Sequence, residues 1–188
     1  MRKIFKIMIG IVASVAVVFA ADEASFRLKA ARTPENVIYR ISGEVVTAKY
    51  YEDTEELAND SAYIVLAECR GSKAFKKSSF DWTRCDFHVE KVFKGDITPG
   101  EDIKVVMMGR NISARDYKKK YGSLPYDFEN EVGGDYKDTD LISMVYNYDR
   151  IPLKGDRAIL FLNESGIFEG EYERTGGGQG ALYEDKAR

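Results

Sequence analysis

The sequence is poor in the residues from which metal and redox sites are built. Its 188 residues include two cysteines, Cys69 and Cys85, and a single histidine, His88. Two cysteines without histidine partners are too few for a zinc site, and they lack the CxxC spacing of redox-active pairs. His88 accompanies no GxSxG motif or other nucleophile signature. We therefore expect no metal, cofactor or catalytic residue, and a solvated His88.

Long apolar runs are also scarce, and the one that exists lies at the start of the chain. Arg2, Lys3 and Lys6 precede an apolar stretch from Ile7 to Ala20, which ends in small residues. This pattern is typical of a secretory signal peptide, predicted here as residues 1–20. The alternative is an uncleaved anchor, but the run is shorter than the ~20 residues of a spanning helix. We expect a secreted, periplasmic or extracellular protein without a stable membrane span.

Basic residues are outnumbered, which bears on the class of partner. The chain has 28 Lys and Arg against 31 Asp and Glu, and removing residues 1–20 would leave 25 against 31, a net charge near −6. Phosphate backbones require clustered cations, so nucleic acid is not an expected partner. Only four prolines occur, whereas Tyr, Phe, Val and Ile are plentiful. We expect one β-rich domain over residues 21–188.

Two segments that alternate with a period of two predict a hairpin around the cysteines. Cys69 shares a strand face with Val65 and Ala67, and Cys85 shares one with Phe87 and Val89. Placing Cys69 opposite Cys85 puts both on the apolar face and predicts a cross-strand disulfide. Closing a loop of about 15 residues would stabilise the fold by about 3 kcal/mol. The alternative is a pair of reduced, buried thiols.

Other segments indicate a short helix and several more strands. Residues 53–61 begin with a possible cap at Asp53 or Thr54 followed by acidic residues, which favours a helix. Residues 35–51 leave two alternatives open, a strand pair or a short helix followed by a strand. Further strands are expected at 102–108, 158–162, 168–174 and 180–183. The strand at 158–162 is expected to be central because it is wholly apolar.

Residues 110–150 predict a long connection, with a helical turn at Ala114 to Tyr121. A connection of this length in a compact domain is usually functional or mobile. Its acidic part, 127–140, lacks the spacing of a calcium loop, so we expect a solvated loop. Tyrosines are favoured at interfaces, and those of this connection form the candidate partner surface: Tyr117, Tyr121, Tyr126, Tyr136, Tyr146 and Tyr148. An alternative of equal weight is that these tyrosines pack the connection against the barrel instead of contacting a partner.

Three glycine-containing motifs are interpreted as turns. FKGD (93–96) and LKGD (153–156) each adjoin a predicted strand, and Gly followed by Asp is turn chemistry rather than an adhesion signal. TGGGQG (175–180) lacks the Lys-Ser/Thr pair and the following helix of a phosphate loop. We interpret it as a glycine-rich hairpin or bulge.

The order of these motifs resembles one family. ELANDSAYIVLAECRG, FHVEKVFKGD, PGEDIKVV, PLKGDRAILFL and GGGQG follow one another as in netrin-like domains, the module of tissue inhibitors of metalloproteinases, and most closely as in secreted bacterial members. The resemblance implies a mostly β, five-stranded OB-fold-like Greek-key barrel spanning about 54–184, with one or two short helices and a long loop between strands 3 and 4.

The inhibitor chemistry of that family does not carry over residue by residue. Those inhibitors chelate zinc through an N-terminal cysteine, whereas the mature chain here would begin Ala21-Asp22-Glu23. Because fold does not imply function, the leading hypothesis is an exported, non-enzymatic domain that binds a protein or glycan partner. The alternatives are a peptidase inhibitor that acts through a loop and a hydrolase.

Overall fold

The computed structural model describes residues 37–43, 49–146 and 149–184, so the predicted signal peptide lies outside the described residues. No helix in the described part of the chain is long and apolar enough to cross a membrane. The strands are β1 (Val37–Gly43), β2 (Tyr63–Lys77), β3 (Phe80–Lys94), β4 (Asp102–Ser113), β5 (Leu141–Tyr146), β6 (Arg157–Glu164), β7 (Tyr172–Arg174) and β8 (Ala181–Tyr183). The helices are α3 (Thr54–Asp60), α4 (Ala114–Tyr121), α5 (Phe128–Val132) and the 3₁₀ turn η1 (Gly177–Gly180).

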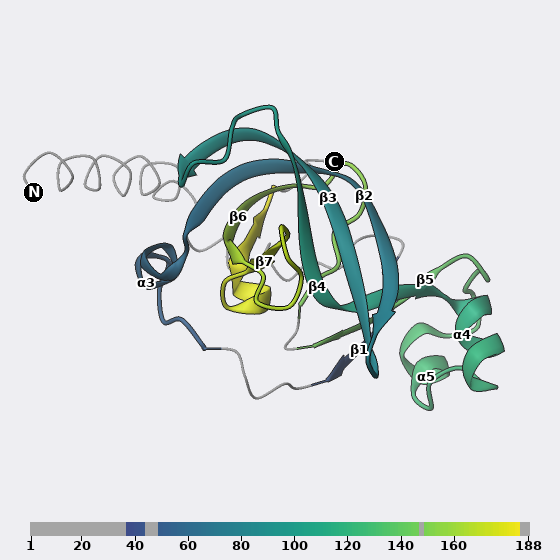
Figure 1. Ribbon diagram of the computed structural model, residues 1–188. Coiled ribbons are helices and arrows are strands. Elements are labelled where there is room, and N and C mark those ends of the chain that lie inside the picture. Colours follow the sequence, from purple (N-terminus) through teal and green to yellow (C-terminus); the bar gives the residue numbers. More distant parts are fainter. Residues whose placement is uncertain (1–36, 44–48, 147–148, 185–188) are drawn as a thin grey trace, which may run out of the picture.

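Five of the strands close into a barrel (Figure 1). β2 pairs antiparallel with β3 and β6, β3 pairs antiparallel with β4, and β6 pairs antiparallel with β7. A short parallel pairing between β4 and β7 closes the ring. This arrangement is OB-fold-like and confirms the predicted five-stranded barrel.

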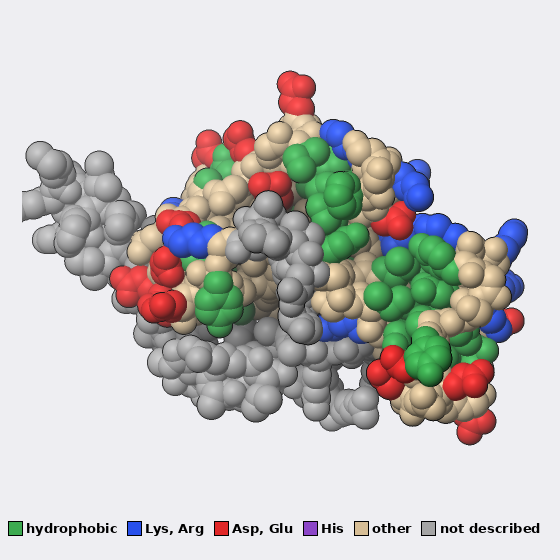
Figure 2. Space-filling view, turned by 90° about the horizontal axis from the view of Figure 1, so that it is seen from below, with side chains coloured by type: hydrophobic (Ala, Val, Ile, Leu, Met, Phe, Trp, Pro, Cys, Tyr) green, Lys and Arg blue, Asp and Glu red, His purple; other side chains and the backbone are tan. Residues whose placement is uncertain are grey.

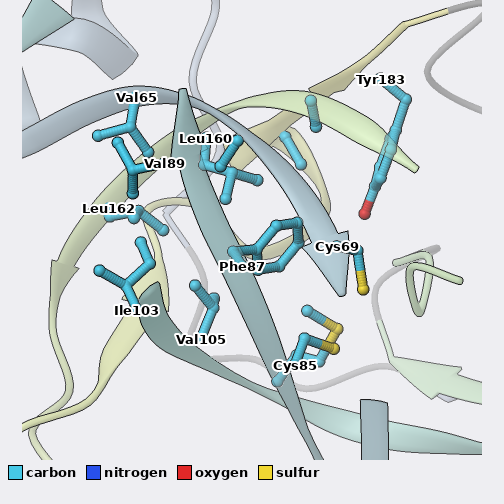
Figure 3. Packing of buried hydrophobic residues seen from close by; sticks show 14 of the residues in the cluster. Val65, Cys69, Cys85, Phe87, Val89, Ile103, Val105, Leu160, Leu162 and Tyr183 are labelled. Atoms are coloured by element: carbon cyan, nitrogen blue, oxygen red, sulfur yellow. The ribbon is translucent and has the colours of Figure 1, made fainter. Parts of the chain in front are cut away.

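The barrel interior is filled by the residues that alternation placed on the apolar faces. Val65, Ala67, Phe87, Val89 and Leu160 are all fully buried. Figure 3 shows Val65, Phe87, Val89 and Leu160 of this core, together with Ile103 and Val105 from β4. The predicted inward face of residues 85–89 is confirmed, and removing this much apolar surface from water is the main favourable contribution to folding.

The predicted hairpin register is wrong by two residues at Cys69 and by three residues at Cys85. Cys69 lies opposite Phe87, and Cys85 lies opposite Ser72, beyond an irregularity between Cys69 and Gly71. A shift of two residues keeps every side chain on its face, so the apolar pattern alone could not detect it. Both cysteines are buried and free in the structure. The structure therefore corresponds to the alternative of two thiols, not to the predicted disulfide.

Both KGD segments are turns, as predicted. Gly95 and Gly155 have φ of +91° and +83°, a region that glycine adopts without strain. In the second turn the Asp156 amide donates to the Leu153 carbonyl at 3.0 Å. The Cys69 amide donates to the Asp156 carbonyl at 2.8 Å, and Gly155 donates back to the Cys69 carbonyl at 2.7 Å. This turn therefore satisfies the β2 backbone where pairing with β3 is irregular.

The predicted long loop between the third and fourth barrel strands is instead a folded unit. β4 changes direction at Gly109, where φ is +111° and a Cβ atom would lie 2.5 Å from the Met144 carbonyl oxygen. Beyond this point β4 pairs with β5, and β5 pairs in parallel with β1. We call β1, β5, the 110–113 end of β4, and helices α4 and α5 the α4–α5 lobe. The predicted helix at Ala114–Tyr121 is confirmed as α4.

The TGGGQG segment is a bulge, one of the two predicted alternatives. Arg174 pairs with Leu162 and Ala181 with Leu160, so residues 175–180 lie opposite Phe161 alone. The Gln179 side chain in this bulge accepts from the Tyr51 amide at 3.0 Å and donates to its carbonyl at 2.8 Å. The bulge thereby holds the segment that leads into α3, the helix expected at 53–61, whose N-cap is Asp53.

Candidate functional site

The α4–α5 lobe separates the candidate tyrosines into exposed and packed groups. Tyr126 is 95% exposed and Tyr121 is 44% exposed. Tyr117 and Tyr136 are half-buried against the small lobe core, and the Tyr136 ring lies 5.1 Å from that of Phe128. The structure therefore places these four tyrosines in the part of the lobe that contains α4 and α5, residues 114–140, and leaves two of them exposed at its surface.

The two remaining candidates do not join this group. Tyr146 is half-buried at the end of β5, where its ring lies against Gly43 and lines a hollow of about 130 Å³. Tyr148 lies outside the described residues. The contact surface expected from the sequence thus reduces to Tyr121 and Tyr126, with Tyr117 and Tyr136 supporting them from below.

Helix α4 gives this surface a cationic border. Ser113 caps its N-terminus by accepting from the Asp116 amide, and Gly122 ends it in the left-handed region. The Lys118 ammonium lies 3.2 Å from the Tyr136 hydroxyl and 3.3 Å from the Asp138 carboxylate, and these two contacts raise the pKa of Lys118. Figure 2 shows hydrophobic side chains gathered over the lobe, with Lys and Arg side chains along its rim.

A second surface of mixed aromatic and cationic residues lies on one face of the β2–β3 hairpin. Across the two strands, Lys77 faces Phe80, Phe75 faces Trp82, and Lys73 faces Arg84. We call these six residues the hairpin face. Sequence reasoning missed it, although cations and aromatics alternate at every second position in both strands.

The β6–β7 loop, residues 165–171, covers part of the hairpin face. The Phe168 ring lies 5.0 Å from Trp82 and 5.5 Å from Phe75, and both pairs are edge-on. The Lys77 ammonium donates to the Ile167 carbonyl at 2.8 Å, and Arg84 forms an ion pair with Glu171 at 2.7 Å. These contacts hold the loop to the hairpin at two points.

One end of the barrel contains a buried group of charges that sequence reasoning also missed. The Arg174 guanidinium forms an ion pair with the Asp149 carboxylate, and both side chains are almost fully buried. Burial is the largest influence on Arg174 and opposes its charged form, but the charge and hydrogen bond of Asp149 together with the nearby Tyr183 raise the pKa of Arg174. No local pattern links these two residues, because their pairing depends on the closure of the barrel.

Tyr183 and Arg150 extend this buried group toward the LKGD turn. Arg174 donates to the Tyr183 hydroxyl at 3.4 Å, and that hydroxyl donates to the Arg150 carbonyl at 3.4 Å. The Arg150 guanidinium lies 4.1 Å from the Tyr183 ring centroid and pairs with Asp156 at 2.6 Å. Burial raises the pKa of the Tyr183 phenol. In this network each of the side chains contacts another, although the buried Nε atoms of Arg150 and Arg174 have no hydrogen-bond partner among the described residues.

The cysteines and the histidine lie apart from both surfaces. In Figure 3, Cys69 and Cys85 lie toward the end of the core opposite Val65 and Val89. A hydrogen bond to Cys69, together with burial, raises the pKa of the Cys85 thiol well above its ordinary value, which disfavours the reactive thiolate. His88 lies at the surface, where its Nδ1 is 2.8 Å from an Asp102 carboxylate oxygen.

The described residues contain no group of three or more His, Cys, Asp or Glu side chains placed to hold a metal ion. The chain matches no protein-family model, no curated protein and no solved structure.

Proposed function

We propose that this protein is an exported, non-enzymatic domain that binds a protein partner through the exposed tyrosines of the α4–α5 lobe. The observation that carries the proposal is Tyr126, which leaves 95% of its surface in water beside the 44% exposed Tyr121, whereas Tyr117, Phe128 and Tyr136 of the lobe pack inward. Exposing a residue of this size contributes nothing to folding, whereas Tyr is enriched in the buried centres of interfaces.

The surroundings of Tyr126 and Tyr121 support this role. The Tyr121 ring lies tilted against the Tyr117 ring with centroids 4.5 Å apart, and this contact restricts both side chains before any partner arrives. A side chain that is already ordered loses less conformational entropy on binding. Arg115 and Lys119 on the same helix form no ion pair with a described residue, so they remain available to a partner's carboxylates.

The compartment and the family in this proposal are inferred from the sequence. The basic start and apolar run of residues 1–20 support export, and the order of strand motifs supports a place among netrin-like domains. A partner at the cell envelope or outside the cell would meet the lobe directly. A glycan partner would use the same tyrosines, by stacking sugar rings on their faces.

Photo-crosslinking in the compartment of the protein tests the proposal. A photo-reactive amino acid at position 126 should give one dominant adduct of defined mass, and Tyr121→Ser in the same chain should reduce its yield at least tenfold. The matched control places the same group at position 50, because Tyr50 is 78% exposed outside the lobe. Equal adducts from both positions, or none from position 126, would contradict the proposal. Protease sensitivity of the adduct separates a protein partner from a glycan.

A further inference from the structure

A second group of exposed hydrophobic side chains with lysines nearby lies at the turn end of the β2–β3 hairpin and on the neighbouring β6–β7 loop. Phe80 is 45% exposed at the turn, and Ile167 in the β6–β7 loop is 49% exposed. Lys77 connects them, since it lies across the ladder from Phe80 and its ammonium binds the Ile167 carbonyl. Two large apolar side chains thus project from neighbouring turns. Neither Phe80 nor Ile167 lines the hollow beside Tyr146 in the α4–α5 lobe.

The charge on the hairpin turn beside Phe80 is positive although the whole chain is acidic, whereas Ile167 lines a hollow with Glu164, Glu169 and Glu171. Residues 71–80 contain three lysines and no acidic residue. The first acid beyond them, Asp81, is already shared between Arg110 at 3.6 Å and Lys120 at 3.5 Å. In the β6–β7 loop, Glu171 is paired with Arg84, which leaves Glu169 as an exposed acid there. Lys73 and Lys76 form no ion pair with any described residue.

We propose that the hairpin turn, with Phe80 and Ile167 as apolar contacts and Lys73 and Lys76 as cationic contacts, docks on an anionic phospholipid bilayer. Apolar side chains on a protruding turn enter the boundary between headgroups and acyl chains, and flanking lysines attract anionic headgroups. A bilayer accommodates a convex apolar tip because its surface deforms, whereas a protein partner would need a matching groove. Lysine stems also allow the ammonium groups to stay at the headgroup level.

The aromatic packing beneath the turn suits this role. Phe168 lies against Phe75 and Trp82, and Lys77 lies 4.3 Å above the Phe168 ring. These contacts hold the two turns together, so that Phe80 and Ile167 do not have to be ordered when the bilayer is reached. The residues of this site differ from Tyr121 and Tyr126, although the Asp81–Lys120 ion pair joins the hairpin to α4. The two proposals are therefore told apart by variants of their own residues.

Trp82 provides a readout at the site itself. It is the only tryptophan of the chain, and it lies on the hairpin face two residues from Phe80. Vesicles of phosphatidylcholine with about one third phosphatidylglycerol, prepared with brominated acyl chains, should quench its fluorescence. Vesicles of brominated phosphatidylcholine alone should not. Adsorption through another part of the chain would not bring Trp82 to the bromines.

Two variants and one matched control test the residues named. Lys73→Ser with Lys76→Ser should weaken binding about five-fold for each lysine, given about one kcal/mol per cation at an anionic surface. Phe80→Ser should weaken it roughly five- to tenfold through lost apolar burial. Arg115→Ser with Lys119→Ser removes the same charge from the lobe and should leave quenching unchanged. Because all these side chains are exposed, the variants should keep the unfolding transition of the parent.

The proposal fails if anionic vesicles leave Trp82 unquenched, whether or not the protein sediments with them. It also fails if the hairpin and lobe variants lose binding equally, since this would indicate attraction by overall charge. Quenching that persists in Phe80→Ser and in the double lysine variant would likewise overturn it. Lys77 is left unchanged in every variant because it anchors the β6–β7 loop.

Discussion

The barrel and the α4–α5 lobe each bury a phenylalanine completely, but in cores of very different size. In the described part of the chain, Phe87 belongs to a cluster of 17 buried residues drawn mainly from β2, β3, β4 and β6. Phe128 belongs to a cluster of four. The barrel strands are paired on both sides, whereas β1 of the lobe pairs with β5 alone among the described residues. Burial of one residue therefore does not measure the stability of the region around it.

This difference has a consequence for where function resides. A closed barrel exposes few large apolar side chains, because the inward-facing side chains of its five strands are buried in its interior. The lobe and the hairpin turn protrude from it, and they carry Tyr121, Tyr126, Phe80 and Ile167, four of the large apolar residues that stay exposed. Regions of lower local stability are the ones that commonly supply binding surfaces.

The largest expected effect comes from truncating the two phenylalanines in parallel. Phe87→Ala should lower the free energy of unfolding by about 3–5 kcal/mol, because it leaves a cavity in the barrel core. Phe128→Ala should instead open the lobe locally and lower the unfolding free energy measured at Trp82 by about 1 kcal/mol. Urea titration followed by Trp82 fluorescence, together with amide hydrogen exchange in α4 and α5, measures both. Equal shifts of the Trp82 transition would mean that barrel and lobe unfold as one unit.

A second prediction concerns the buried ion pair at the barrel end. Asp149→Asn leaves the Arg174 charge buried without its counter-ion and should cost about 3 kcal/mol. Asp102→Asn is the control, because its carboxylate is largely exposed and contacts only His88 among the described residues. Its unfolding midpoint in urea should stay close to that of the parent. If the two variants unfold at the same urea concentration, the buried pair has no special role in holding the barrel closed.

The smallest predicted effect is an alkaline loss of stability that the barrel should show more strongly than the lobe. Burial raises the pKa of Tyr183 in the barrel and, less completely, that of Tyr117 in the lobe. The unfolded chain ionises near pH 10, before the folded chain does. The stabilisation is therefore fully present below pH 10 and is lost as pH rises above it, by about 1.4 kcal/mol per pH unit for each such group.

Urea midpoints measured between pH 9 and pH 11 test this order. Tyr183→Phe should flatten the alkaline decline of stability more than Tyr117→Phe does. The two variants serve as controls for one another, since each removes one phenol hydroxyl. If Tyr117→Phe flattened the alkaline decline of stability more than Tyr183→Phe, the lobe tyrosine would be the more deeply buried of the two in solution.

Much of the barrel follows from local patterns. Alternation identified the inward faces of Val65 and Phe87, and the glycine-containing motifs located the turns at Gly95 and Gly155. The helix at Ala114–Tyr121 followed from its own residues. The tyrosine surface stays a prediction. The sequence places six tyrosines in one connection but cannot say which of them the lobe core takes up.

What the sequence by itself determined is therefore the face of each strand and the position of each turn, since these depend on residues within a few positions of one another. Only the tertiary structure decided that Cys69 lies opposite Phe87, that Arg174 meets Asp149, and that Phe168 covers Trp82. Each of these pairings depends on strand register or on barrel closure. A shift of register by two residues preserves the apolar pattern, so the choice rests on bulges and turns whose energies come from distant parts of the chain.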